Sequence, residues 1–178
     1  MTKSATLRLQ DHRAILALVG ECRDLGDHHP HWQRHALQNL ARLTGAELSV
    51  GGEIGGFSAG KPRDIGTPGD WGFENGFDKR GWFLALEMMA TNPEYQPALF
   101  QYLQREGHIR GSAMRNTDLI PREEWQRSLE YSIYRMIGID HNIGCFHLIP
   151  GTSDEWVGGY LWRAKGCPDF TARHPGIR

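Results

Sequence analysis

The sequence is short of three features, and each shortage excludes a class of protein. It has three cysteines in 178 residues, Cys22, Cys145 and Cys167, which are too few and too scattered for a disulfide framework. It has no run of about 18 apolar residues, so no segment is expected to span a membrane. Its first ten residues lack the apolar stretch of a signal peptide. We therefore expect a cytoplasmic protein with no membrane contact.

The charges show no excess of either sign. Twenty Lys and Arg residues face 21 Asp and Glu residues, for a net charge of −1. This balance argues against a nucleic-acid-binding surface as the main property of these residues. Apolar residues make up 39% and charged residues 23%, proportions that are typical of a folded chain. The length suits a single domain over residues 1–178.

Several segments repeat apolar residues with helical spacing, which predicts helices over 11–25, 31–43 and 77–90. A further helix is expected after Pro121. There the spacing places four apolar residues on one stripe that should face a sheet: Trp125, Leu129, Ile133 and Met136. Replacing Leu129 with alanine should then cost about 2–5 kcal/mol.

Three segments are strand-like: 46–54, 142–149 and 155–165. In the last, Trp156, Tyr160 and Trp162 alternate with residues that point the other way. Residues 150–154 are the loop of a hairpin between the second and third strands, and Gly51–Gly52 would allow a bend or bulge in the first. The order of elements predicts an α+β fold, with an antiparallel sheet and helices packed on one side.

No motif of a known catalytic type is present, so no enzyme activity is predicted. The glycines near residue 51 lack the pattern of a phosphate loop, and no serine lies in a nucleophile elbow. His141, Cys145 and His147 alternate in a way that metal ligands sometimes do, yet they match no standard spacing. A second histidine cluster, His28, His29 and His31, is better explained as a solvated connector. The sequence does not identify a cofactor, and ordinary structural roles are favoured for both clusters.

The aromatic residues between 71 and 83 are interspersed with glycines, which is compatible with a pocket for a planar or apolar ligand. We expect this pocket between the helices and the sheet, with an arginine to hold an acidic group of the ligand. The alternative is that the rings only fill the core. The predicted lining residues are Trp71, Phe73, Trp82, Phe83, Tyr160 and Trp162, with Arg63 or Arg115 as the cation.

Several stretches resemble the N-terminal, GAF/PAS-like sensor region of bacterial LuxR-type transcription regulators. They are the opening helix at 11–25 with Trp32, the segments 40–46 and 115–121, the positions Trp125, Ser128 and Tyr131, and the segments 162–166 and 170–173.

The resemblance implies a non-catalytic domain that senses a small molecule or relays a signal. It also implies a homodimer that pairs through its flanking helices. In such regulators a helix-turn-helix follows the sensor region and contacts DNA. The 178 residues contain no such motif, so we expect them to be either the sensor part of such a regulator or a stand-alone relative. DNA contact is expected only through the additional segment. Two alternatives remain open: a dimerisation or scaffold module without ligand, and a metal- or haem-binding protein that uses His141, Cys145 and His147.

Overall fold

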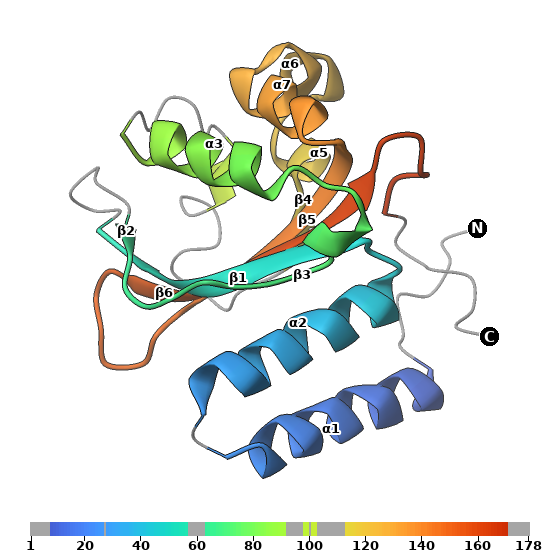
Figure 1. The fold of residues 1–178 in the computed structure, drawn as a ribbon, viewed down its shortest axis with the longest axis vertical. Coiled ribbons are helices and arrows are strands. Elements are labelled where there is room, and N and C mark those ends of the chain that lie inside the picture. Colours follow the sequence, from blue (N-terminus) through green and yellow to red (C-terminus); the bar gives the residue numbers. More distant parts are fainter. Residues whose placement is uncertain are drawn as a thin grey trace.

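The fold has three layers, with a sheet between two sets of helices (Figure 1). The structure is a computed structural model that describes residues 8–26, 28–56, 63–91, 98–99, 101–102 and 113–170. None of the helices in these ranges is both long and apolar enough to cross a membrane.

The sheet is antiparallel throughout, with the strand order β2-β1-β6-β5-β4 and with β3 paired to β1. The long strands β5 and β6 form the expected hairpin, and β6 lies at the centre of the sheet between β1 and β5. The strands are β1 (Leu48–Gly55), β2 (Arg63–Asp64), β3 (Gly69–Trp71), β4 (Met114–Arg115), β5 (Ile139–Leu148) and β6 (Glu155–Ala164).

Two helices, α1 (Leu9–Asp24) and α2 (His29–Thr44), cover one face of the sheet. Helix α2 lies directly on β1, where the Ser49 hydroxyl donates to the Leu37 carbonyl at 3.2 Å. The Gln33 amide donates to the Gly51 carbonyl at 3.0 Å. These bonds satisfy polar groups that the helix would otherwise bury without partners. Helix α1 packs on the outer side of α2 (Figure 1).

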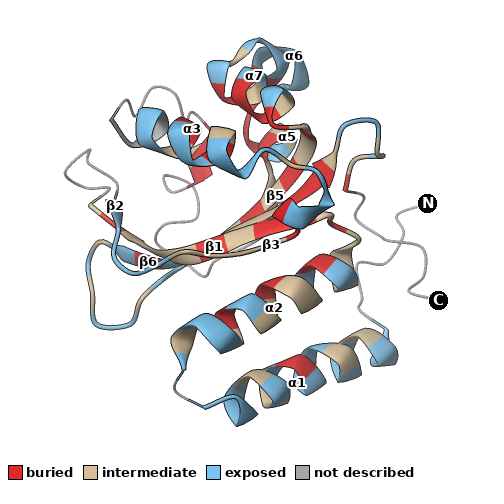
Figure 2. Cartoon of the chain, viewed as in Figure 1, coloured by how far each residue is buried: buried red, intermediate tan, exposed pale blue. Residues whose placement is uncertain are grey.

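The opposite face carries the main core and the remaining helices. These are the 3₁₀ helix η1 (Phe73–Asn75) and the helices α3 (Lys79–Thr91), α5 (Asn116–Leu119), α6 (Arg122–Arg127) and α7 (Leu129–Met136). Trp82, Ile133 and Tyr134 from these helices pack with Leu48 and Trp162 from the sheet. Buried residues are concentrated in this layer and in the strands (Figure 2).

The α+β class and the antiparallel sheet are confirmed, but helices cover both faces of the sheet rather than one. The reason is that the strands are apolar on both sides. On β5 and β6, Phe146 and Trp162 belong to the main core, while Ile143 and Leu161 pack on the second, smaller cluster with Ala41. Each face therefore needs its own cover.

The centre of the sheet is built from paired glycines. Gly51 lies opposite Gly159, and Gly52 lies opposite Gly158. A Cβ atom on Gly159 would collide with the carbonyl oxygen of Val50. The register of β1 is continuous here, so Gly51–Gly52 form no bulge, and the irregularity in the sheet lies in β5. The glycines instead allow neighbouring backbones to approach closely.

The helix expected after Pro121 is interrupted at Ser128. Helix α6 ends at Arg127, Ser128 is extended with ψ of 152°, and its hydroxyl accepts from the Tyr131 N–H at 3.0 Å to begin α7. This restart changes the phase of the buried face. Of the predicted stripe, Trp125 and Ile133 are buried, whereas Leu129 is 43% and Met136 76% exposed. The expectation that all four face the sheet is therefore wrong.

Because Leu129 is exposed, the expected effect of Leu129→Ala is smaller than its spacing in the sequence suggests. We expect Leu129→Ala to lower the free energy of unfolding by less than about 1 kcal/mol, because the side chain already lies partly in solvent and leaves no closed cavity. Ile133→Ala should cost about 2–5 kcal/mol, because it leaves a cavity in the main core. Urea unfolding of both variants measures the difference. A larger loss for Leu129→Ala than for Ile133→Ala would contradict this assignment.

Candidate functional site

Four large rings meet in the interior between the sheet and the layer of α3 and α7. Trp82 on α3 packs edge-on against Trp162 on β6, with ring centroids 4.7 Å apart. Tyr160 stacks on Trp162 at 5.6 Å, and Tyr134 on α7 lies 6.0 Å from Trp162. Aromatic contacts of this kind contribute about 0.5–1.5 kcal/mol each beyond the burial of area. They form a rigid apolar wall.

A buried acid stands beside this wall. Glu130, in the first turn of α7, is 1% exposed. Its carboxyl accepts hydrogen bonds from the Asn116 amide at 3.4 Å, the Tyr134 hydroxyl at 3.2 Å and the Ala98 N–H at 3.4 Å. Burial raises the pKa of Glu130 to about 8, and the three hydrogen bonds only partly offset this rise. The side chain is therefore largely protonated at neutral pH.

Several buried donors have no hydrogen-bond acceptor among the described residues. They include the indole N–H groups of Trp82, Trp156 and Trp162 in the main core and the side-chain amide of Asn142 on β5. A buried donor without an acceptor costs about 1–3 kcal/mol, so most native interiors avoid it. Together with the protonated carboxyl of Glu130, these groups give the aromatic interior a capacity to donate hydrogen bonds.

A small cavity adjoins the acid. It measures about 10 Å³, roughly the space that one water molecule needs. Tyr102 lines it, and the Tyr102 hydroxyl donates to the Phe146 carbonyl and accepts from the Phe146 N–H, both at 3.0 Å. The cavity is lined by Ala98, Leu99, Tyr102, Met114, Asn116, Leu119, Gly144, Phe146 and Tyr160.

The structure brings together part of the predicted pocket lining. Trp82, Trp162, Phe73 and Tyr160 all belong to the main core or pack against it. The cavity lies beside Tyr160, not beside the tryptophans.

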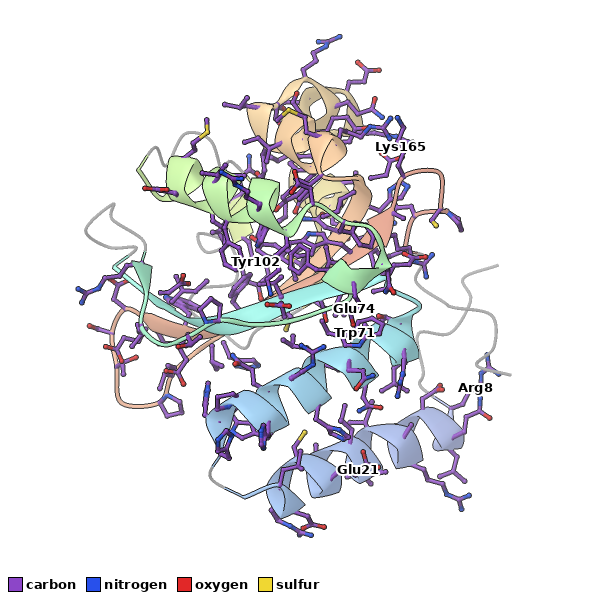
Figure 3. All side chains as sticks on the ribbon, viewed as in Figure 1. Arg8, Glu21, Trp71, Glu74, Tyr102 and Lys165 are labelled. Carbon is purple, nitrogen blue, oxygen red and sulfur yellow. The ribbon has the colours of Figure 1, made fainter. Side chains whose placement is uncertain are left out.

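The other predicted lining residues lie elsewhere. Trp71 packs in the second cluster, on the α2 side of the sheet, whereas Tyr102 lies on the α3 side (Figure 3). Phe83 is an exposed residue of α3. Arg63 is exposed on the short strand β2.

Arg115 holds the end of the domain. Its guanidinium is paired with Asp118 and lies 3.7 Å from an Asp169 carboxylate oxygen, and it donates to the Phe170 carbonyl at 2.9 Å. The hydrogen bond from Arg115 lowers the pKa of Asp118. Arg163 donates to the Pro168 carbonyl at 2.9 Å in the same region. Both arginines therefore fix the segment 168–170 against the sheet.

The two histidine clusters do not form a metal site in the described part of the chain. No group of three or more His, Cys, Asp or Glu side chains there is placed to hold an ion. His141 instead lies 3.4 Å from Asp169. Burial raises the pKa of Cys145, which favours the unreactive thiol over the thiolate.

Sequence reasoning missed the polar members of the site. Glu130, Asn116 and Tyr102 come from three separate segments, and their contacts with one another and with Phe146 depend on how α5 and α7 pack on β5. The one local signal is the Ser128 cap, which sets the phase of α7 and so turns Glu130 inward.

Comparison with known proteins gives one informative likeness. No family model and no curated protein matches the chain. Among solved structures, the ligand-binding domain (LBD) of VqsR from Pseudomonas aeruginosa aligns with a TM-score of 0.55 and 13% sequence identity. The alignment covers 88% of this chain and 81% of that one. At this identity the likeness shows a common fold.

Proposed function

We propose that the chain is a non-catalytic sensory domain of a bacterial transcription regulator, of the GAF/PAS-like kind, that binds a small molecule in its aromatic interior. The observation that carries the proposal is the set of buried, unpaired indole donors, among them those of Trp82 and Trp162, in the same core as the protonated Glu130. In a core that only fills space, buried donors without acceptors destabilise the fold and are normally avoided. The fold of the VqsR ligand-binding domain and the sequence resemblance to LuxR-type sensor regions support the same proposal.

The donors define the class of ligand that fits. Trp82, Trp162 and Glu130 would each donate a hydrogen bond, so the ligand should carry carbonyl-type acceptors, and the surrounding rings favour an apolar remainder. An acidic ligand fits less well, because Arg115 already binds Asp118 and Arg63 is far out on β2. Since the cavity holds about one water molecule, binding requires the helical layer to move away from the sheet.

Strand β4 connects the cavity with the segment 168–170 at the end of the domain. Met114 and Asn116 line the cavity, and Arg115 between them holds the Phe170 carbonyl. A ligand that shifts β4 would therefore shift the segment 168–170. In this proposal the shift changes the arrangement of a DNA-binding segment joined to the domain, by favouring one of two existing conformations.

Thermal unfolding tests the ligand site. We expect neutral amides and esters with an apolar chain to raise the melting temperature, in line with about 2.7 kcal/mol of stabilisation at one hundred times the dissociation constant. Trp82→Phe removes one indole donor and should weaken binding about tenfold, because one hydrogen bond is lost. Trp32→Phe makes the same change on α2, on the other face, and should leave the affinity unaltered.

A flat melting temperature across such compounds would overturn the ligand proposal. Equal effects of Trp82→Phe and Trp32→Phe would show that any binding occurs outside the aromatic interior. The first result would favour a dimerisation module without ligand, whereas the second would place the ligand site on another part of the domain.

A further inference from the structure

Glu130 joins separate parts of the helical layer that covers the main-core face of the sheet. Its carboxyl binds the Asn116 side chain of α5, the Tyr134 hydroxyl of its own helix α7 and the Ala98 N–H. Helices α5 and α7 both pack on β5 (Figure 1). The Asn116 N–H also donates to the Asn142 side chain of that strand at 3.3 Å. The position of this layer on the sheet therefore depends in part on one buried acid.

The three hydrogen bonds to Glu130 suit a neutral carboxylic acid better than a carboxylate. All three donors are uncharged groups, and they lie 3.2, 3.4 and 3.4 Å from the carboxyl oxygens. A carboxylate usually draws a hydroxyl donor to about 2.5–2.7 Å, whereas the Tyr134 hydroxyl lies 3.2 Å away. Loss of the proton would therefore leave a buried charge with little compensation, which is costly in an interior of low dielectric constant.

The other titratable groups around Glu130 in the described part of the chain supply no positive charge. Tyr134 on α7 and Tyr160 on β6 interact with the acid, and Tyr102 lies beside Tyr160. Burial, and after it the nearby acid, raises the pKa of Tyr134 and Tyr160 well above the ordinary value, so both hydroxyls keep their protons at mildly alkaline pH. Glu130 is therefore the group whose charge changes first in this cluster.

The acid can reach water through a small movement of α7. Glu130 lies in the first turn of this helix, which has only eight residues, and its neighbour Leu129 is 43% exposed. Two of the residues that bind the acid, Ala98 and Asn116, also line the cavity of about 10 Å³, which has room for about one water molecule. Lifting the first turn of α7 would hydrate the carboxylate and leave the strand pairing of the sheet intact.

We propose that Glu130 is a proton-controlled latch, which holds α5 and α7 on β5 while it is protonated and releases them when its proton passes to the solvent. The open form has a hydrated carboxylate and binds fewer protons than the closed form, so a rise in pH favours it. Burial raises the pKa of Glu130 to about 8, which places the opening at mildly alkaline pH. A fall in pH closes the latch again. The latch does not depend on a ligand, and a domain that binds none would have it as well.

Hydrogen–deuterium exchange followed by mass spectrometry, without added ligand, measures the opening of each helix. The wild type is compared with Glu130→Gln, which keeps the shape of the protonated acid and cannot ionise. Comparing the two proteins at the same pH cancels the intrinsic pH dependence of exchange. Between about pH 6 and pH 9 the ratio of the wild-type rate to the variant rate in α5 and α7 should rise about a hundredfold, given a pKa near 4.5 in the open form and about 8 in the closed form. If Glu130→Gln does not fold, wild-type rates divided by those of unstructured peptides give the same comparison.

Urea separates this local opening from unfolding of the whole domain. About 1 M urea should hardly change the exchange of α5 and α7 at pH 9, because local opening exposes little surface, whereas it accelerates exchange that requires global unfolding. Glu124→Gln makes the same chemical change on an exposed acid of α6 and should exchange like the wild type. An exchange ratio that is equal at both pH values, or one that rises only through urea-sensitive unfolding, would overturn the proposal.

Discussion

Replacing Gly159 with valine is expected to prevent the chain from folding stably. The side chain would be forced against the Val50 carbonyl and the Gly51 backbone, and neither can move without breaking the pairing of β1 with β6. We expect the free energy of unfolding to fall by more than about 4 kcal/mol, a loss that points to a specific steric cause. Denaturant unfolding followed by circular dichroism measures it.

The matched control lies on the same strand. Val157→Ala changes a side chain exposed on the surface of β6 and should cost less than about 1 kcal/mol. Valine favours strands and glycine does not, so strand propensity alone predicts that Gly159→Val is stabilising. A folded Gly159→Val variant within 1 kcal/mol of the wild type would show that the backbones are not in close contact.

Between pH 4.5 and pH 8 the free energy of unfolding is expected to decrease because of Glu130. The pKa of this acid is about 8 in the folded chain and near 4.5 when unfolded, so over this range only the folded state keeps the proton. Its contribution is complete below pH 4.5 and is lost as the pH rises through 8. The loss amounts to roughly 5 kcal/mol at 1.36 kcal/mol per pH unit.

Glu130→Gln isolates this contribution from those of other titrating groups. Glutamine resembles the protonated acid in shape and has no charge to bury, so the variant should be close to the wild type near pH 5 and more stable than it at pH 8. Denaturant unfolding of both proteins at several pH values gives the difference. A difference that does not change with pH would mean that Glu130 is solvated or paired with a cation.

The strands could be predicted because their signal is local. Trp156, Tyr160 and Trp162 alternate along one strand, and the structure places all three on the main core. The ends of the first two helices were also predictable, because Gly26 and Gly45 both have positive φ, which glycine adopts without strain.

The arrangement of the helical layers could not be predicted in the same way. The helical spacing of apolar residues continues without change through Ser128. The sequence pattern therefore does not show the helix break that exposes Leu129 and buries Glu130. Likewise, Trp71 and Phe73 are two residues apart, and their spacing suggests that the two rings lie on the same side of a strand. Gly72 between them is left-handed, with φ of 101°, and starts η1. The two rings therefore belong to different clusters on opposite faces of the sheet. The residues that form the site are therefore brought together by turns, and the backbone geometry of these turns cannot be predicted from the spacing of apolar side chains.

The central position of β6 has a consequence for protein synthesis. Gly55 pairs with Glu155, 100 positions later in the chain. At a translation rate of about 5–20 residues per second, β1 waits roughly 5–20 seconds for the strand that completes the sheet. During that time its edge is open to other nascent chains. Folding of this domain is therefore expected to be slow and to begin only when synthesis of β6 is complete, because its decisive contacts are distant in sequence.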